Sequence, residues 1–101
     1  MDKHNCSVAI QVLPIDSNAN DKIRIDIITK IIGYIQSTGL KYEVGPFETT
    51  IEGDLDALME IVKGCQTLAI KEGAGSVMSY VKIFHNPQGV LTIEEKTTKF
   101  R

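Results

Sequence analysis

The chain has 101 residues, a net charge of −2 and hydrophobic residues at 43% of its positions. This length supports a single domain, 1–101, and the composition excludes an intrinsically disordered chain. The near-neutral charge argues against nucleic acid as a partner, and no apolar stretch approaches the ~18 residues that a membrane span requires.

The first predicted elements are a strand and a helix. Apolar side chains alternate with small or polar ones from position 8 to 12, which is typical of a strand with one inward face, and Pro14 is expected to end it. A polar connection, 16–21, leads into a helix that Gly39 ends. The apolar residues at helical spacing in this helix are Ile27, Ile28, Ile31, Ile32 and Ile35.

A β-hairpin and a second helix are predicted next. Short strands are expected at 42–44 and 47–52, with a turn at Gly45 between them. The pattern then changes to that of a helix, and Asp54 is placed to cap its first turn. One face of this helix carries Leu55, Leu58, Met59, Val62, Cys65 and Ala69.

The last predicted elements are a fourth strand and a short helix. Gly73 ends the second helix, the strand covers 77–84, and Thr92 with Glu95 forms the capping-box pattern of a C-terminal helix. The order of elements predicts an α+β fold, a ferredoxin-like βαββαβ sandwich. Its four-stranded antiparallel sheet has two helices on one face and the short C-terminal helix outside this unit.

The sheet face without helices is predicted to be too apolar for plain exposure to solvent. Its side chains are expected to be Ala9, Leu13, Met78, Tyr80, Lys82 and Phe84. A contiguous apolar patch of this kind usually marks an interface, so we expect a homodimer or homotetramer formed through the sheet faces. The alternative is that a loop or the terminal helix of the same chain covers the patch.

Segment 49–54 gathers hydroxyl and carboxylate side chains at a strand end just before a helix, where small ligands often bind. Glu52 and Asp54 share a strand parity, so a carboxylate pair for acid–base catalysis is one interpretation, and it would make the protein a small enzyme. The competing interpretation is that Asp54 caps the helix while Glu52 lies in solvent or accepts a backbone hydrogen bond.

The cysteines and histidines give only a weak metal signal. Cys6 and Cys65 have no Cys-x-x-Cys partner, and His4 and His85 fall near the ends of strands that would be neighbours in the sheet. We therefore expect packed, reduced thiols, no metal and no cofactor. Without a targeting segment, the simplest expectation is a cytoplasmic protein.

Three segments, 12–14, 39–46 and 49–56, together resemble the thiamine-binding protein family, short single-domain relatives of the YkoF thiamine-binding proteins. The most specific part is the Thr-x-x-Glu-Gly-Asp run that follows the Gly-Pro turn. The resemblance covers nearly the whole chain. It implies a ferredoxin-like, non-enzymatic protein that binds thiamine or its hydroxymethylpyrimidine moiety and assembles into dimers or tetramers.

The residue types are chemically compatible with such a ligand, which the protein would bind as a carrier, buffer or sensor. Threonine hydroxyls can pair with an aminopyrimidine, aromatic rings can stack on it, and carboxylates can stabilise a thiazolium cation. The expected contacts are Tyr42, Glu43, Phe47, Thr49, Thr50, Glu52 and Tyr80. The alternative is a structural oligomer without a small ligand. A ligand-binding measurement would distinguish it from a ligand-binding protein.

Overall fold

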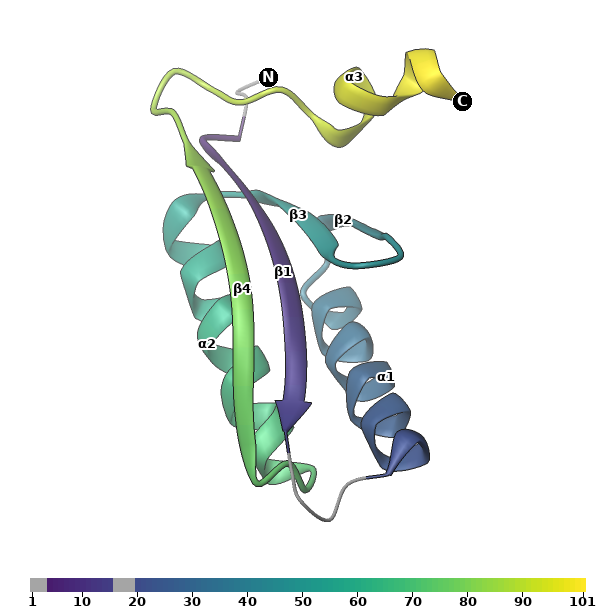
Figure 1. Ribbon diagram of the computed structural model, residues 1–101. Helices are drawn as coiled ribbons and strands as arrows, with labels where there is room; N and C mark the ends of the chain where they lie inside the picture. The colour runs from purple at the N-terminus through teal and green to yellow at the C-terminus, as the bar shows by residue number, and fades with distance from the viewer. Residues whose placement is uncertain (1–3, 16–19) are drawn as a thin grey trace.

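The computed structural model describes residues 4–15 and 20–101, and its strands form one antiparallel sheet. The strands are β1 (Cys6–Ile15), β2 (Lys41–Val44), β3 (Thr49–Gly53) and β4 (Ser76–His85), in the order β2-β3-β1-β4. Helices α1 (Asp21–Ser37) and α2 (Leu55–Lys71) cover one face, while α3 (Ile93–Thr97) lies at one end of the sheet (Figure 1). The predicted α+β, ferredoxin-like architecture is confirmed.

Local capping determines where α1 begins and ends. The Asn20 side chain accepts a hydrogen bond from the Ile23 amide at 2.9 Å, which satisfies one of the free N–H groups of the first turn. Beyond the last turn Gly39 adopts φ +77°, a conformation that side chains other than glycine rarely adopt. The predicted helix is confirmed, although most of the polar connection before it, 16–19, lies outside the described residues.

Helix α2 is capped differently from the prediction. Asp54 occupies the N-cap position, but its side chain makes no capping hydrogen bond. The amide of Leu55 instead donates to Oδ1 of Asn5 at 2.9 Å, so a residue at the start of β1 takes over part of the capping. Ile61 joins the predicted residues of the buried face at 4% exposure.

Two strand boundaries, the end of β1 and the start of β3, differ from the prediction by two residues. β1 continues through Pro14, which pairs with Val77 of β4. A proline is tolerated there because β3 pairs with β1 only as far as Ile10, so β1 has one unpaired edge beyond that point. β3 begins at Thr49 rather than at position 47, since residues 45–48 form a turn in which the Gly45 amide donates to the Glu48 carbonyl at 2.9 Å.

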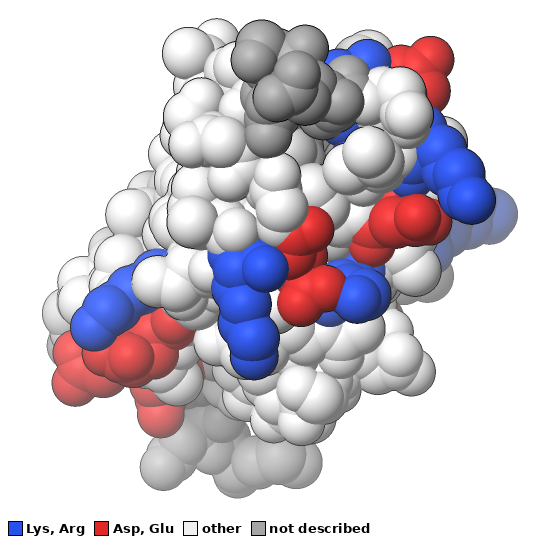
Figure 2. Space-filling view, turned by 90° about the horizontal axis from the view of Figure 1, so that it is seen from below, with Lys and Arg blue, Asp and Glu red and all other residues white. Residues whose placement is uncertain are grey.

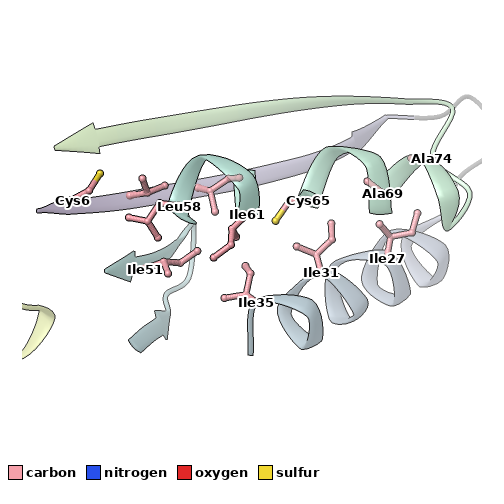
Figure 3. Close-up of a cluster of buried hydrophobic side chains, with 12 residues drawn as sticks. Cys6, Ile27, Ile31, Ile35, Ile51, Leu58, Ile61, Cys65, Ala69 and Ala74 are labelled. Carbon is pink, nitrogen blue, oxygen red and sulfur yellow. The ribbon is translucent and has the colours of Figure 1, made fainter. Parts of the chain in front are cut away.

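The hydrophobic core lies between the sheet and the two long helices (Figure 3). Its members are Cys6, Val8, Ile10, Ile27, Ile31, Ile35, Ile51, Leu58, Ile61, Cys65, Ala69 and Ala74. Both cysteines are free and buried, as predicted. Burial raises the pKa of the Cys65 thiol from its ordinary 9.0 to about 11, so this thiol stays protonated near neutral pH.

The C-terminal segment is held against the sheet face that lacks α1 and α2. Thr92 and Glu95 form both hydrogen bonds of the predicted capping box. The Ile93 amide then donates to Oε2 of Glu52 at 2.8 Å, and Ile93 is buried. Arg101 pairs with Glu43 of β2. The segment therefore attaches to the β2–β3 half of this face.

The β1–β4 half of the same face stays open. The register pairs Leu13 with Met78, Gln11 with Tyr80, Ala9 with Lys82 and Ser7 with Phe84, so these side chains share one side of the sheet. Met78, Tyr80 and Phe84 are 48%, 59% and 64% exposed. The alternative of cover by the terminal segment thus holds for one half only, and the expected association of copies concerns the other half. We call the exposed half, Ala9, Leu13, Met78, Tyr80, Lys82 and Phe84, the open strip.

Candidate functional site

A hollow of about 220 Å³ lies beside the turn that joins β2 to β3. The turn, the middle and C-terminal part of α1 and the second half of β1 surround it. The residues that line this hairpin hollow are Ile10, Gln11, Val12, Leu13, Ile28, Ile31, Ile32, Ile35, Val44, Gly45, Pro46, Phe47, Glu48 and Thr49. Most of them are apolar, so the hollow presents hydrophobic walls with a few polar groups.

The hollow exists because the strands of the sheet differ in length. β1 has 10 residues, whereas β2 has 4 and β3 has 5. β3 pairs with β1 only up to Ile10, and the edge of β1 beyond that residue borders the hollow. Backbone groups on this edge are therefore available for hydrogen bonds to a bound molecule.

The turn at this hollow is tightly built around Gly45. A Cβ atom on Gly45 would lie 3.0 Å from the Glu48 carbonyl oxygen, which is the atom that accepts the Gly45 amide hydrogen bond. Any larger side chain would push these two residues apart. The turn thus keeps Phe47 and Glu48 beside the hollow because Gly45 allows the close approach.

The polar residues of the hollow are Gln11, Glu48 and Thr49. Thr49 is 7% exposed. The Glu48 carboxylate lies 3.0 Å from Nζ of Lys82 on β4, and the two side chains are 35% and 72% exposed respectively. An apolar hollow with a few polar groups is the usual composition of a small-molecule site.

The residues predicted to bind ligand are divided between the two faces of the sheet. Thr49 faces the hairpin hollow, whereas its neighbour Thr50 points to the other face, because successive side chains of a strand alternate. Thr50 and Glu43 line an outer hollow on that face together with Lys82. Phe47, 78% exposed, lines both hollows.

The other predicted contacts lie away from the hairpin hollow. Tyr42 packs against the core, and Tyr80 belongs to the open strip. Glu52 is 5% exposed and accepts the hydrogen bond from Ile93. This is the structural alternative considered for Glu52 from the sequence, whereas Asp54 is exposed and follows the end of β3.

Reading the sequence alone did not identify Gln11, Glu48 or Val44 as site residues. It placed Ile28 and Ile32 on the core-facing side of α1, but both line the hollow, and Ile28 is 37% exposed. The available signal was that α1 carries two adjacent rows of isoleucine, more than one buried stripe needs.

Within residues 4–15 and 20–101, no group of three or more His, Cys, Asp or Glu side chains could hold a metal ion. His85 Nδ1 lies 2.9 Å from the Asn5 carbonyl oxygen. None of the helices that the structure describes is long and apolar enough to cross a membrane.

The end of the molecule opposite α3 carries interspersed basic and acidic side chains (Figure 2). In a depression between α1 and α2, Lys30 pairs with Glu72. The hydrogen bond from Lys30 lowers the pKa of the Glu72 carboxyl, and the same bond raises the pKa of Lys30. Lys30 and Glu72 thus neutralise each other in this depression. The hairpin hollow therefore remains the best candidate site.

Comparison with known proteins adds independent information. A family model described as thiamine-binding protein matches residues 8–101. A UPF0045 protein of Clostridium perfringens is 49% identical over 96 residues, which are 95% of this chain and 97% of that protein. A UPF0045 protein of Staphylococcus xylosus is 31% identical over 78 residues, covering 75% of this chain and 73% of that protein.

Two solved structures are also similar. A Bacillus cereus domain of unknown function, DUF77, has a TM-score of 0.85 at 34% identity, with 97% of this chain and 91% of that chain covered. A Thermotoga maritima protein provisionally described as a thiamine biosynthesis/salvage protein has a TM-score of 0.82 at 34% identity, with 96% and 99% covered.

Proposed function

This chain belongs to the thiamine-binding protein family, and from that premise we propose that it binds thiamine or its hydroxymethylpyrimidine moiety without chemical turnover. The family match over residues 8–101 and the similar Thermotoga maritima protein support a binding role. The observation that carries the proposal is the hairpin hollow, which combines apolar walls with a small set of polar groups.

The size of the hollow favours a single aromatic ring as its occupant. Its volume of about 220 Å³ is below the ~300–1,000 Å³ typical of pockets that enclose drug-sized ligands. A pyrimidine ring needs less space than a complete two-ring ligand, so we propose that the pyrimidine enters the hollow and the rest of thiamine stays near its mouth.

The polar groups of the hollow match an aminopyrimidine. This ring has an amino donor and nitrogen acceptors, and the Thr49 hydroxyl can both donate and accept. The free edge of β1 beyond Ile10 adds backbone groups, and Phe47 provides a flat face for stacking. Thr50 and Glu43 remain proposed contacts for a part of the ligand that reaches the outer hollow.

We propose that the protein acts as a carrier, buffer or sensor in the cytoplasm. Cys6 and Cys65 are both free thiols, which fits a reducing compartment. Burial protects both from solvent, and no cofactor is needed for binding alone. In each of these roles, the occupancy of the protein would follow the concentration of its ligand.

We also propose that two copies associate through the open strip as a homodimer or as part of a homotetramer. Met78, Tyr80 and Phe84 expose apolar surface on neighbouring positions of one strand, and burial against a second copy would remove it from water. Light scattering should give a dimer or tetramer for the wild type and a smaller particle for Tyr80→Glu. Lys63→Glu, on the exposed side of α2, is the matched control.

A small enzyme that uses Glu52 and Asp54 is the competing function. The hydrogen bond from the Ile93 amide to the Glu52 carboxylate supports a structural role for Glu52 instead. Product formation from thiamine or its esters that disappears in Glu52→Gln would favour the enzyme.

A thermal-shift panel tests the binding proposal directly. Thiamine, its phosphates and free hydroxymethylpyrimidine are each added to the wild type, since a ligand at a hundred times its Kd adds about 2.7 kcal/mol to the free energy of unfolding. We expect a shift with at least one of them and its loss in Ile32→Phe, which fills the hollow. No shift with any member of the panel would reject the proposed function.

A further inference from the structure

We infer that the hairpin hollow selects an aromatic ligand carrying a positive charge, and that Glu48 is the residue that determines this selectivity. The inference deepens the proposed function and rests on it. It predicts that thiamine itself, whose thiazolium is a cation, binds more tightly than its phosphate esters.

Glu48 is the one charged residue among the described residues that line the hollow, and its carboxylate lies beside Lys82 of the outer hollow, at the mouth. The remaining polar side chains there, Gln11 and Thr49, are neutral, and the walls are apolar. A cation next to the ring would therefore meet a carboxylate. A phosphate carried by the second ring would lie at the mouth of the hollow, where the same carboxylate repels its negative charge.

The position of Glu48 suits a ligand that is only partly enclosed. Its side chain is 35% exposed, so its field is less screened than that of a carboxylate fully in water. It also lines the outer hollow, so it lies where the hollow opens to the surface. A two-ring ligand with its neutral ring inside would present its second ring at that opening.

Lys82 is the cation nearest to this carboxylate, and it does not convert the site into an anion site. Nζ of Lys82 lies 3.0 Å from Oε2 of Glu48, but the lysine side chain is 72% exposed. Ion pairs of such exposed groups are weak, so a ligand cation competes with Lys82 for Glu48 at little cost. Lys82 belongs to the outer hollow and not to the hairpin hollow.

The test is a calorimetric titration of three probes: thiamine, the uncharged hydroxymethylpyrimidine and thiamine monophosphate. For the wild type we expect thiamine to bind about tenfold more tightly than the monophosphate. Glu48→Gln should weaken thiamine about tenfold, which corresponds to about 1.4 kcal/mol, and should leave hydroxymethylpyrimidine within about twofold. Glu60→Gln is the matched control, since Glu60 is exposed on α2 and lines neither hollow, and it should leave all three affinities unchanged.

Lys82→Gln adds a result that a purely structural role of Glu48 would not give. Removing the competing ammonium should strengthen thiamine binding about twofold to fivefold and leave hydroxymethylpyrimidine unchanged. The ligand-free thermal midpoints of the variants, measured beside the titrations, confirm that each one is folded.

The outcomes separate this inference from the proposed function. Binding of thiamine and hydroxymethylpyrimidine with equal losses for both in Glu48→Gln would overturn the selectivity and leave the binding function in place. Tighter binding of the monophosphate than of thiamine, lost in Lys82→Gln, would assign the site to anions instead. Absence of binding by all three probes would overturn both proposals.

Discussion

The two long helices pack differently against the same sheet. On the α2 side, Leu58, Cys65 and Ala69 are completely buried against the strands (Figure 3). On the α1 side, the buried Ile31 and Ile35 line the hairpin hollow together with the more exposed Ile28 and Ile32. Apolar residues beyond those needed for one buried stripe thus mark the place where the fold leaves a hollow.

The largest change in the free energy of unfolding is expected from variants that remove side-chain atoms on the α2 side and on the α1 side. Leu58→Ala should lower the free energy of unfolding by about 2–5 kcal/mol, because the closed packing cannot collapse around the lost atoms. Ile28→Ala, at a residue that is 37% exposed, should cost about 1 kcal/mol or less. Urea denaturation measures both values. Equal losses would show that the α1 side is packed as completely as the α2 side.

Larger side chains on α2 and α1 should reveal the same contrast, with a smaller change in the free energy of unfolding. Ala69→Leu should cost about 1–3 kcal/mol, because Ala69 has no exposed surface and the larger side chain must displace its neighbours. Ile32→Phe extends into the hollow and should change the free energy of unfolding by less than about 1 kcal/mol. The comparison is again made by urea denaturation. A loss for Ile32→Phe as large as that for Ala69→Leu would argue against usable space in the hollow.

The Cys65 thiol on the α2 side should also make the stability of the protein depend on pH. Burial raises the pKa of Cys65 to about 11, whereas the thiol of the unfolded chain titrates near its ordinary 9.0. Between these values the unfolded chain has lost the proton that the folded chain retains, so stability falls as pH rises. The slope is about 1.4 kcal/mol per pH unit, starting near pH 9.

Cys65→Ala isolates this contribution from the lysines and tyrosines that titrate in the same range. The free energy of unfolding should fall more steeply from pH 8 to pH 10 in the wild type than in the variant. Parallel pH profiles for the two proteins would show that the Cys65 thiol is not held in a dry environment.

The smallest expected effect concerns the ligand on the α1 side. Thr49→Val should weaken binding of thiamine or hydroxymethylpyrimidine by about tenfold at most, since one hydrogen bond contributes about 0.5–1.5 kcal/mol. Thr50→Val changes the adjacent residue on the opposite face and should leave the affinity for hydroxymethylpyrimidine unchanged. Titration of both variants gives the answer. Unchanged affinity in Thr49→Val would remove Thr49 from the proposed site.

Sequence reasoning succeeded where the determining contacts are local. The capping residues near α1 and the Thr92–Glu95 box act within a few positions of the chain, and the structure shows both. It failed for the capping of α2, where the Asp54 side chain makes no capping hydrogen bond and Asn5 instead accepts a hydrogen bond from the Leu55 amide. Those residues are about fifty positions apart, and no local pattern records that they meet.

The candidate site was predictable in composition but not in arrangement. Segment 49–54 was chosen because its polar residues are consecutive, yet a strand sends Thr49 and Thr50 to opposite faces. Glu52 turned out to hold the C-terminal segment through the Ile93 amide. No sequence motif marks Glu48, because a single carboxylate in a turn has no characteristic pattern. Only the pairing of β1 with β3 shows that Glu48 borders a hollow.

The sequence by itself determined the order of the elements, the ferredoxin-like class and the family resemblance, because periodicity, capping and turn residues act over short distances. Tertiary structure alone decided which polar residues share a face, which half of the open sheet the C-terminal segment covers and where the hollow lies. These features depend on strand register and on unequal strand lengths, which arise only when distant parts of the chain pack together.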